Sequence, residues 1–388
     1  MMTESQRALS GTRLIDLTDA RAIYGAKLLS DLGADTVRPI PPEGDPLANR
    51  GPIDKQSGES LWYAFHTTSR RLFHMSNSSK SRRQLQSLCE HANVIVLNDG
   101  HPFESFLDLA NVRDSNPGLV IVECTSFGNT GPWKDYLAPD LVAGALGGSV
   151  AITGDEDTPP LKPFGDVNFA VSGAYVAVAA LAALRHSRQT GKGQLVRVSV
   201  HECIASCLEH VFMWYLYNDV FRHAKGKALE RRGSLHWSNL YQVMQAKNGH
   251  IMVTPTPSLD NQLVWLIEEN AFEDLLDPEY QEPNARGRWA RRMMEVLRSW
   301  VATKDVESLF YEAQEHHAPF GWVHDIPQVA DNPQLAGRDW WSSLEVSGNS
   351  VKSTGSPYSH SDTPAEAGGI EHLSAESEGI IDAIGWGN

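Results

Sequence analysis

The chain has 388 residues, of which 41% are hydrophobic and 21% are charged, a balance typical of a soluble globular protein long enough for two domains. Its 33 Lys and Arg residues against 48 Asp and Glu residues give a formal net charge of -15, which argues against a nucleic-acid partner held by a basic face. An anionic ligand therefore needs a local group of arginines or lysines.

The sequence lacks the usual signals of secretion, membrane insertion and zinc binding. The first residues, MMTESQRALSG, contain no apolar core of a signal peptide. The longest run without strongly polar residues, 173–184, is shorter than the roughly 17–25 residues that span a membrane. The four cysteines form no CxxC pair, so we expect no metal site and free, buried thiols in a reducing compartment. We therefore expect a cytoplasmic protein with no membrane partner.

The N-terminal third alternates between short apolar strands and helices. We expect strands at 14–17, 36–40, 72–75, 93–97 and 119–124, and helices at 22–32, 79–91 and 106–115. Such alternation predicts an α/β domain with a mostly parallel sheet. No GxGxxG follows the first strand, which disfavours a nicotinamide-dependent oxidoreductase and implies that any bound phosphate is held by other groups.

In parallel sheets, ligands bind beyond the carboxyl ends of the strands. This rule places three segments on one rim: 18–21, 98–99 and 126–131. Arg21 and Arg38 both fall near this rim, and an arginine can hold a carboxylate through two parallel hydrogen bonds. Arg21 is therefore a candidate for binding a dicarboxylate or an acid-bearing acyl group.

The stretch 141–184 changes from an apolar, glycine-rich segment to a proline-rich loop and then to a long helix of small residues. Gly165 and Asp166 stand immediately before that helix. A carboxylate near a helix N-terminus is stabilised as the anion, and glycine lets backbone or ligand come close. Asp166 is therefore either a helix cap or a functional carboxylate.

The second half of the chain has a different pattern of predicted strands and helices. We expect a strand at 196–200, an apolar helix at 201–217, a hairpin around Asn248-Gly249, and helices within 261–302 and 305–316. This pattern predicts a large domain that starts at 1–218, a linker at 219–240, a smaller α/β domain at 241–330, and a C-terminal return to the large domain at 331–388.

The order of motifs resembles the family III CoA-transferases, a superfamily that includes α-methylacyl-CoA racemases. The resemblance spans almost the whole chain and rests on the blocks LIDLTDARAIYGAKLLSDLGADTV, PPEGDPL, NPGLVIVECTSFGNTGP, APDLVAGALGGSVAITG, GDVNFAVSGAYVAVAALAALRHSRQTGKGQLVRVSV and NLYQVMQAKNGHIMV. It implies a Rossmann-like large domain built from both chain ends, a smaller inserted domain, and a homodimer of two interlocked chains.

The resemblance also implies an active site. In the transferases, the aspartate of a GD pair before the small-residue helix is the nucleophile, and here it is Asp166. Its carboxylate attacks an acyl-CoA thioester, and a mixed anhydride and an aspartyl-CoA thioester follow before an acceptor acid leaves as the new acyl-CoA. Candidates for contacts with CoA or the acceptor carboxylate are Arg21, Arg38, Arg70, Asn98 and Lys134, and the substrate loop includes Asp140 and Gly165.

Departures from the family pattern keep alternatives open. The racemases need a histidine where Pro139 stands, and Asp140 cannot easily serve as both acid and base, so racemization is disfavoured. An intramolecular CoA-transfer isomerase on the same fold remains an alternative. The family's basic stretch reads HTTSRR at 66–71, and Ile40 replaces an acidic residue. These changes motivate a second alternative, a non-catalytic homologue or partner subunit with weakened CoA binding.

Overall fold

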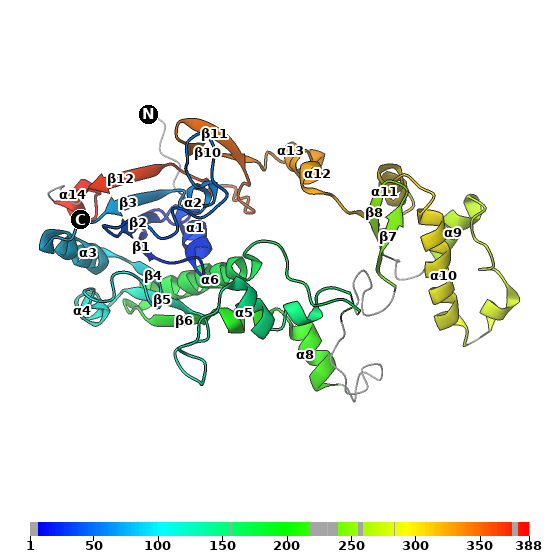
Figure 1. Cartoon of the computed structure of the whole chain (residues 1–388), viewed down its shortest axis with the longest axis horizontal. Helices are drawn as coiled ribbons and strands as arrows, with labels where there is room; N and C mark the ends of the chain where they lie inside the picture. The colour runs from blue at the N-terminus through cyan, green and yellow to red at the C-terminus, as the bar shows by residue number, and fades with distance from the viewer. Residues whose placement is uncertain are drawn as a thin grey trace. The chain divides into compact units, whose positions relative to one another are not determined.

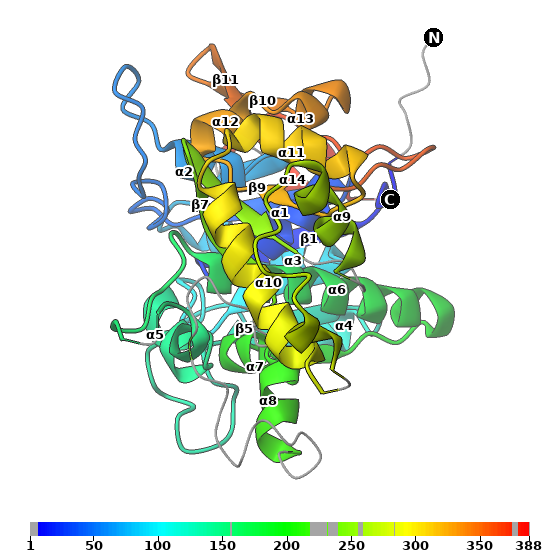
Figure 2. The ribbon, with the colours of Figure 1, turned by 90° about the vertical axis from the view of Figure 1, so that its right-hand side faces the viewer.

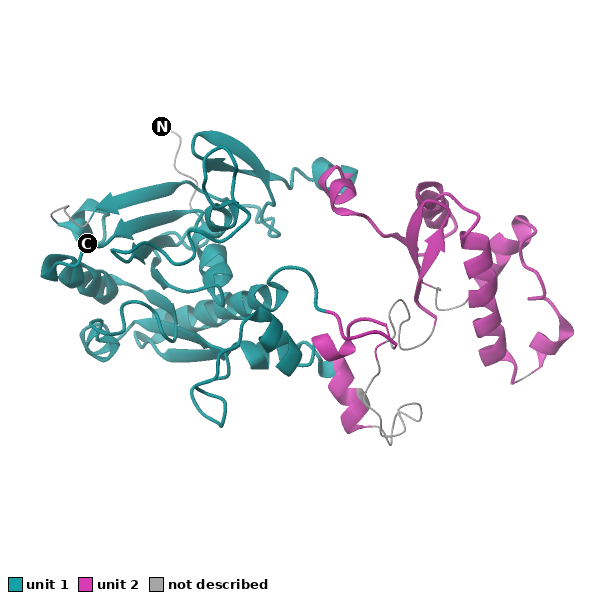
Figure 3. Cartoon of the chain, in the orientation of Figure 1, with its two compact units in different colours: residues 1–149, 162–209, 333–388 teal, residues 150–161, 210–332 magenta. Residues whose placement is uncertain are grey.

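A computed structural model describes residues 7–155, 157–217, 231, 240–254, 259–282, 284–374 and 379–387. The chain divides into two compact units (Figure 3). Unit 1 comprises Met1–Ser149, Lys162–Glu209 and Pro333–Asn388, and unit 2 comprises Val150–Leu161 and His210–Asn332. Unit 2 thus takes in 150–161 and 210–217, which the sequence assigns to the large domain, whereas most of the predicted linker at 219–240 lies outside the described residues.

Unit 1 is built on a parallel sheet (Figure 1). Its seven described strands are β1 (Arg13–Leu17), β2 (Asp35–Ile40), β3 (Arg70–His74), β4 (Val94–Asn98), β5 (Val120–Thr125), β6 (Leu195–Ser199) and β12 (Ile370–Ser374). They pair in the order β12-β3-β2-β1-β4-β5-β6. Strand order therefore reverses between β1 and β4, as in a Rossmann-like fold, and both ends of the chain contribute strands, as predicted.

Helices cover both faces of this sheet. One face packs against α1 (Ile23–Asp31), α6 (Val167–Thr190) and α7 (Val200–Ser206), and the other against α3 (Ser79–His91), α4 (Leu109–Ser115) and α14 (Ile380–Ala383). Alternate residues of one strand enter opposite cores: Val94 and Val96 the first, Ile95 and Leu97 the second. Burial on both sides explains why these strands read as continuous apolar runs in the sequence.

Small residues allow α1 and α6 to approach closely. A Cβ added at Gly173 of α6 would lie 2.8 Å from the backbone nitrogen of Gly25 and 2.9 Å from Cβ of Tyr24. The helix α6 has 24 residues, more than the apolar run counted in the sequence, and by length and composition alone it could cross a membrane. Half of its most apolar window is buried within the structure.

The rest of unit 1 surrounds this three-layered core. It includes α2 (Leu61–His66), α5 (Asp140–Leu146), α13 (Pro333–Gly337) and a hairpin of β10 (Ser342–Val346) and β11 (Asn349–Ser353). The apolar helix predicted at 201–217 is interrupted at Cys207 and Leu208, so that α7 is followed by a separate α8 (Glu209–Leu216). Cys207 is exposed at this break, contrary to the expectation of buried thiols, whereas Cys89, Cys124 and Cys203 are buried.

Unit 2 has its own apolar core. The predicted hairpin around Asn248-Gly249 is confirmed as β7 (Gln242–Ala246) and β8 (Gly249–Val253), with β9 (Gly321–Trp322) added to β8. The helices are α8, whose first residue belongs to unit 1, α9 (Asp260–Glu268), α10 (Arg286–Val301), α11 (Val306–Glu315) and α12 (Ile326–Ala330), with short 3-10 turns η1 (Val150–Ile152) and η2 (Pro278–Gln281). Figure 2 shows α10 in yellow, and its buried face packs with Trp265, Ile251 and Leu309 in one core.

Candidate active site

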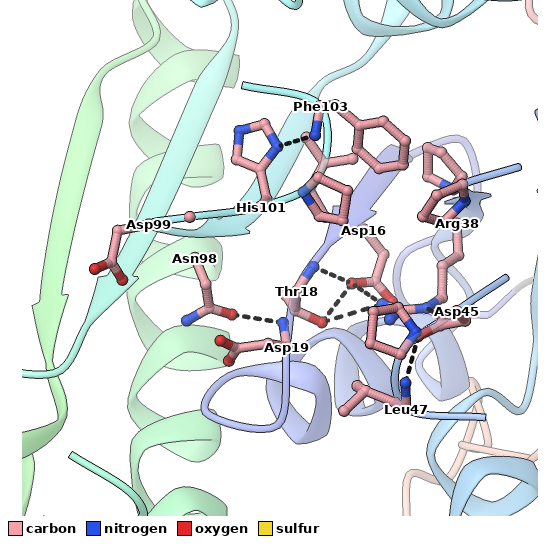
Figure 4. A pocket seen from close by; sticks show the side chains of 16 residues that line it. Asp16, Thr18, Asp19, Arg38, Asp45, Leu47, Asn98, Asp99, His101 and Phe103 are labelled. Atoms are coloured by element: carbon pink, nitrogen blue, oxygen red, sulfur yellow. Dashed lines mark hydrogen bonds and ion pairs between the residues drawn. The ribbon is translucent and has the colours of Figure 1, made fainter. Parts of the chain in front are cut away.

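A pocket opens where strand order reverses in the sheet of unit 1 (Figure 4). Its cavity volume is about 140 Å³, and its walls follow the carboxyl ends of β1, β2 and β4. Thr18 and Asp19 come from the first of these strand ends, and Asn98 and Asp99 from the last, as the sequence predicts for the rim. This is the place where open α/β sheets bind ligands.

Asn98 ties the strand ends together beneath the pocket. Its side chain is buried, its Oδ1 accepts a hydrogen bond from the backbone nitrogen of Asp19 at 2.8 Å, and its Nδ2 donates to the carbonyl oxygen of Cys124 at 2.6 Å. These bonds connect the ends of β1, β4 and β5. Both groups of the amide serve the scaffold, so Asn98 shapes the pocket from behind.

Two predicted CoA-binding arginines lie in a buried charge cluster under the pocket. Arg38 donates from Nε to Asp45 at 2.7 Å and lies 3.1 Å from Asp16, whereas Arg70 donates from Nε to Asp16 at 2.8 Å. Burial lowers the pKa of Arg38, but Asp16 and Asp45 outweigh it and hold the pKa above its ordinary value. Their charges are paired with aspartates inside the fold, and the prediction that these arginines contact CoA stays a prediction.

Arg21 is also engaged within the protein. Its guanidinium contacts both carboxylate oxygens of Asp19, the carboxylate and carbonyl of Asp99, and the hydroxyl of Ser126. Burial alone lowers the pKa of Arg21, and the two aspartates raise it above the ordinary value. This network fixes three loops on the rim, but it uses the donors that the sequence assigns to a dicarboxylate.

Lys134 differs from these arginines because it is exposed. It lies in the loop after β5, its side chain is 53% exposed, and its Nζ is 4.0 Å from Asp135. A surface ion pair with charges this far apart contributes little stability. Lys134 therefore keeps a charge available to solvent, and its role in binding CoA phosphates stays a prediction.

Asp166 stands at the N-cap position of α6 without capping the helix. Among the described residues, its side chain makes no capping hydrogen bond to the first turn. The neighbouring Gly165 has φ of +79°, a conformation that side chains other than glycine adopt rarely, and a Cβ there would meet open space. Gly165 thus turns the loop so that Asp166 begins the helix with a partly exposed side chain.

Asp140 supplies the cap that Asp166 does not. Its buried carboxylate accepts the backbone N–H of Phe169 and the side-chain amide of Asn168, each at 3.0 Å, and lies 3.3 Å from Nζ of Lys162. A capping interaction of this kind is worth about 1 kcal/mol. The structure therefore separates two roles: Asp140 holds the helix terminus, and Asp166 is left to interact elsewhere.

Asp166 instead forms an ion pair with Arg50 from the loop between β2 and α2. Nη2 of Arg50 contacts Oδ2 of Asp166, and the guanidinium lies 4.6 Å from the ring centroid of Trp62 in α2. Both charged side chains are about one third exposed. A carboxylate that is reachable from solvent and placed at a helix N-terminus, which favours the anion, can act as a nucleophile.

A model of CoA-transferase family III matches residues 9–369. The chain belongs to CoA-transferase family III. It is 29% identical to succinyl-CoA:mesaconate CoA-transferase of Haloarcula hispanica, over 98% of this chain and 97% of that protein. It is 27% identical to formyl-CoA:oxalate CoA-transferase of Streptomyces avermitilis, over 93% and 91%. A CAIB/BAIF family protein from Brucella suis shares the fold, with a TM-score of 0.80 at 24% identity over 97% and 99%.

The family III chain is therefore an enzyme of a class that uses CoA thioesters. Sequence reasoning placed Asp166 and the rim segments but missed Arg50 and Trp62. A signal for Arg50 exists, because the loop 41–60 leaves the carboxyl end of β2 and so starts on the ligand-binding edge of the sheet. Its pairing with Asp166 could not be read from the sequence, because 116 residues separate the two.

Proposed function

We propose that this family III enzyme transfers CoA from an acyl-CoA to a carboxylic acid, with Asp166 as the covalent nucleophile. The observation that carries the proposal is the position of Asp166: it occupies the start of α6, is relieved of capping by Asp140, and is one third exposed. The names of the relatives from Haloarcula and Streptomyces describe the same reaction type.

The chemistry needs no general base. A carboxylate anion attacks the thioester carbonyl directly, and no proton has to be removed in that step. The reaction does need hydrogen-bond donors for the oxyanion that forms on this carbonyl. Asp140 occupies the N–H group of Phe169, and the N–H groups of Val167 and Asn168 at the very start of α6 are suited to that role.

The pocket at the reversal of strand order suits the uncharged part of CoA. Asp19 and Asp99 line it, and Arg38 is already neutralised beneath it, so it does not favour a phosphate. The adenine ring is the uncharged end of CoA, and ligands of open α/β sheets bind at this place. We therefore place the adenine in this pocket and the phosphates, including the one on the ribose, toward Lys134 on the exposed loop.

The acceptor is best sought among dicarboxylic acids. The relatives named above act on mesaconate and oxalate, and a further relative, 26% identical over 94% of this chain, is the succinate–glutarate CoA-transferase of Agrobacterium fabrum. A panel of these acids with their CoA thioesters therefore covers the proposed substrate class.

Intact-mass analysis after incubation with each acyl-CoA tests the proposal. We expect an aspartyl-CoA adduct on the wild type, its loss in Asp166→Ala, and formation of new acyl-CoA after addition of an acid. Absence of the adduct with the whole panel would contradict the proposal and favour the non-catalytic alternative. Exchange of the α-proton with deuterium oxide, without any acceptor acid, would instead favour the racemase.

We also propose that the enzyme is a homodimer in the cytoplasm. Large apolar side chains are exposed on α6 of unit 1, including Tyr175, Val178 and Leu181. Contiguous exposed apolar surface is typical of a subunit interface. Light scattering coupled to size-exclusion chromatography measures the assembly, and a monomer at micromolar concentration would contradict it.

A further inference from the structure

We propose that Arg50 binds the reacting carboxylates in turn. At rest it pairs with the carboxylate of Asp166, and it binds the carboxylate of the substrate acid while Asp166 is an aspartyl-CoA thioester. This inference rests on the proposed function. It assigns acid recognition to an arginine that the motif comparison did not single out, in place of Arg21.

Solvent reaches the contact between Arg50 and Asp166. Arg50 and Asp166 are 32% and 30% exposed, so a substrate carboxylate can reach their contact from solvent. The three arginines predicted for this role do not share that property. Arg38 and Arg70 are buried in the charge cluster, and Arg21 is enclosed by Asp19 and Asp99.

Groups other than Asp166 also hold Arg50 in place. Its guanidinium lies over Trp62, and Trp62 is stacked on His66 with 3.9 Å between ring centroids. The hydroxyl of Ser60, which caps α2, donates to the carbonyl oxygen of Arg50. A cation over an aromatic ring is stabilised by about 0.5–2 kcal/mol. The arginine can therefore stay in place when Asp166 loses its charge.

During the first half-reaction the negative charge passes from Asp166 to the CoA thiolate and then to the donor acid. An oxygen of Asp166 bonds to the thioester carbon, the carbon–sulfur bond breaks, and the electron pair leaves on the CoA thiolate. The thiolate then attacks Cγ of Asp166, the anhydride bond breaks, and the donor acid leaves as a carboxylate. Asp166 is now a neutral thioester, so Arg50 has lost its protein partner and a carboxylate of equal charge is present beside it.

The second half-reaction runs these steps in reverse with the acceptor. The acceptor carboxylate attacks Cγ and expels thiolate, and the thiolate attacks the acceptor's acyl carbon to give the new acyl-CoA and free Asp166. No proton is transferred in any step, and the sum of charges at the site is constant. One permanent cation beside Cγ can therefore serve Asp166 and both acids in turn, and arginine keeps its charge at any working pH.

The resting contact joins one guanidinium nitrogen of Arg50, Nη2, to one carboxylate oxygen of Asp166, Oδ2. A planar guanidinium can bind a carboxylate through two parallel hydrogen bonds, whereas an ammonium acts as a point charge. We therefore expect Arg50→Lys to restore part of the acid binding that Arg50→Gln loses.

The test uses the full-length enzyme and separates the half-reactions. Aspartyl-CoA enzyme is formed with an acyl-CoA, freed of small molecules, and mixed with increasing concentrations of acceptor acid. In Arg50→Gln we expect the KM for the acid to rise about 10- to 100-fold, as for loss of a hydrogen bond to a charged group, with a smaller rise in Arg50→Lys. Arg197→Gln is the control, since Arg197 forms a similar surface pair with Glu123 in the same unit. An unchanged KM in Arg50→Gln would overturn the inference.

A second measurement does not depend on turnover. Carbodiimide labelling of Asp166, followed by peptide mass spectrometry, is expected to be faster in Arg50→Gln than in the wild type and in Arg197→Gln, because the ion pair shields the carboxylate. Equal labelling in all three would overturn the ion pair on which the inference depends. Failure of the wild type to form aspartyl-CoA contradicts the proposed function, whereas an adduct that forms normally and is resolved equally well without Arg50 contradicts the role of Arg50 alone.

Discussion

Replacing Asp16 by asparagine should destabilise unit 1 strongly, because Asp16 balances two buried arginines. The charges of Asp16, Asp45, Arg38 and Arg70 sum to zero in the native cluster, and their side chains are between 0% and 5% exposed. Asp16→Asn keeps the shape but leaves one buried positive charge uncompensated. Breaking a buried pair in this way costs about 3–5 kcal/mol, a large part of a total stability of about 5–15 kcal/mol.

Urea unfolding followed by circular dichroism measures this effect. With a slope of about 3 kcal/mol per molar urea, the midpoint should fall by roughly 1–1.7 M. Glu123→Gln is the control, because it removes a solvent-exposed pair with Arg197 and should cost under about 1 kcal/mol. A midpoint for Asp16→Asn within about 0.3 M of the wild type would refute the argument from charge balance.

The pH dependence of the same cluster has a definite sign. Burial alone raises the pKa of Asp16, but Arg38 and Arg70 outweigh it, and the net pKa lies below the ordinary value. The stability contributed by ionised Asp16 is therefore complete above its unfolded pKa near 4 and is lost as the pH falls below that value. Asp16→Asn should lack this acid-dependent component.

Three further changes test other parts of unit 1. Gly173→Ala should destabilise the enzyme by about 1–3 kcal/mol in urea unfolding, because the added methyl group meets the backbone of Gly25; an unchanged midpoint would show that the helices can separate at no cost. Burial lowers the pKa of His66 to about 3, so the stability contributed by neutral His66 is complete above its ordinary pKa of 6.5. Between pH 7 and pH 5 the free energy of unfolding should therefore fall by about 2 kcal/mol more in the wild type than in His66→Gln. Parallel pH curves for the two proteins would contradict this. A thiol reagent should label Cys207 in the native enzyme and all four cysteines after unfolding, because the other three are buried. Burial also raises the pKa of Cys203 to about 12, which lowers its reactivity. Rapid labelling of more than one thiol in the native enzyme would contradict the burial of Cys89, Cys124 and Cys203.

Much of the fold could be predicted because local patterns dictate it. The strands of the sheet are apolar runs bounded by turns, and their alternation with helices predicts a parallel sheet with a ligand-binding rim. Interruptions such as Cys207-Leu208 between α7 and α8 were missed, because the run 201–217 stays apolar across the break. Periodicity alone does not reveal where one buried helix ends and the next begins.

The site was less predictable because residue type does not reveal how a charge is used. Arg38 looked like a phosphate ligand, but whether it faces solvent depends on Asp16 and Asp45, which bind it inside the fold. Asp166 looked like a helix cap until the structure showed Asp140 in that role from a different helix. Such pairings join distant segments, and they depend on backbone geometry that no single stretch of sequence specifies.

The strand β12 has a consequence for how the enzyme is made. It joins the sheet beside β3, and Glu371 on β12 pairs with Arg71 on β3 across 300 residues of chain. At a synthesis rate of about 5–20 residues per second, β12 is synthesised roughly 15–60 s after β3. An open strand edge invites pairing with other chains, and charged side chains discourage it. The charge of Arg71 therefore disfavours pairing of the open edge of β3 with other chains until β12 is made. A chain without β12 would leave this edge of β3 permanently open.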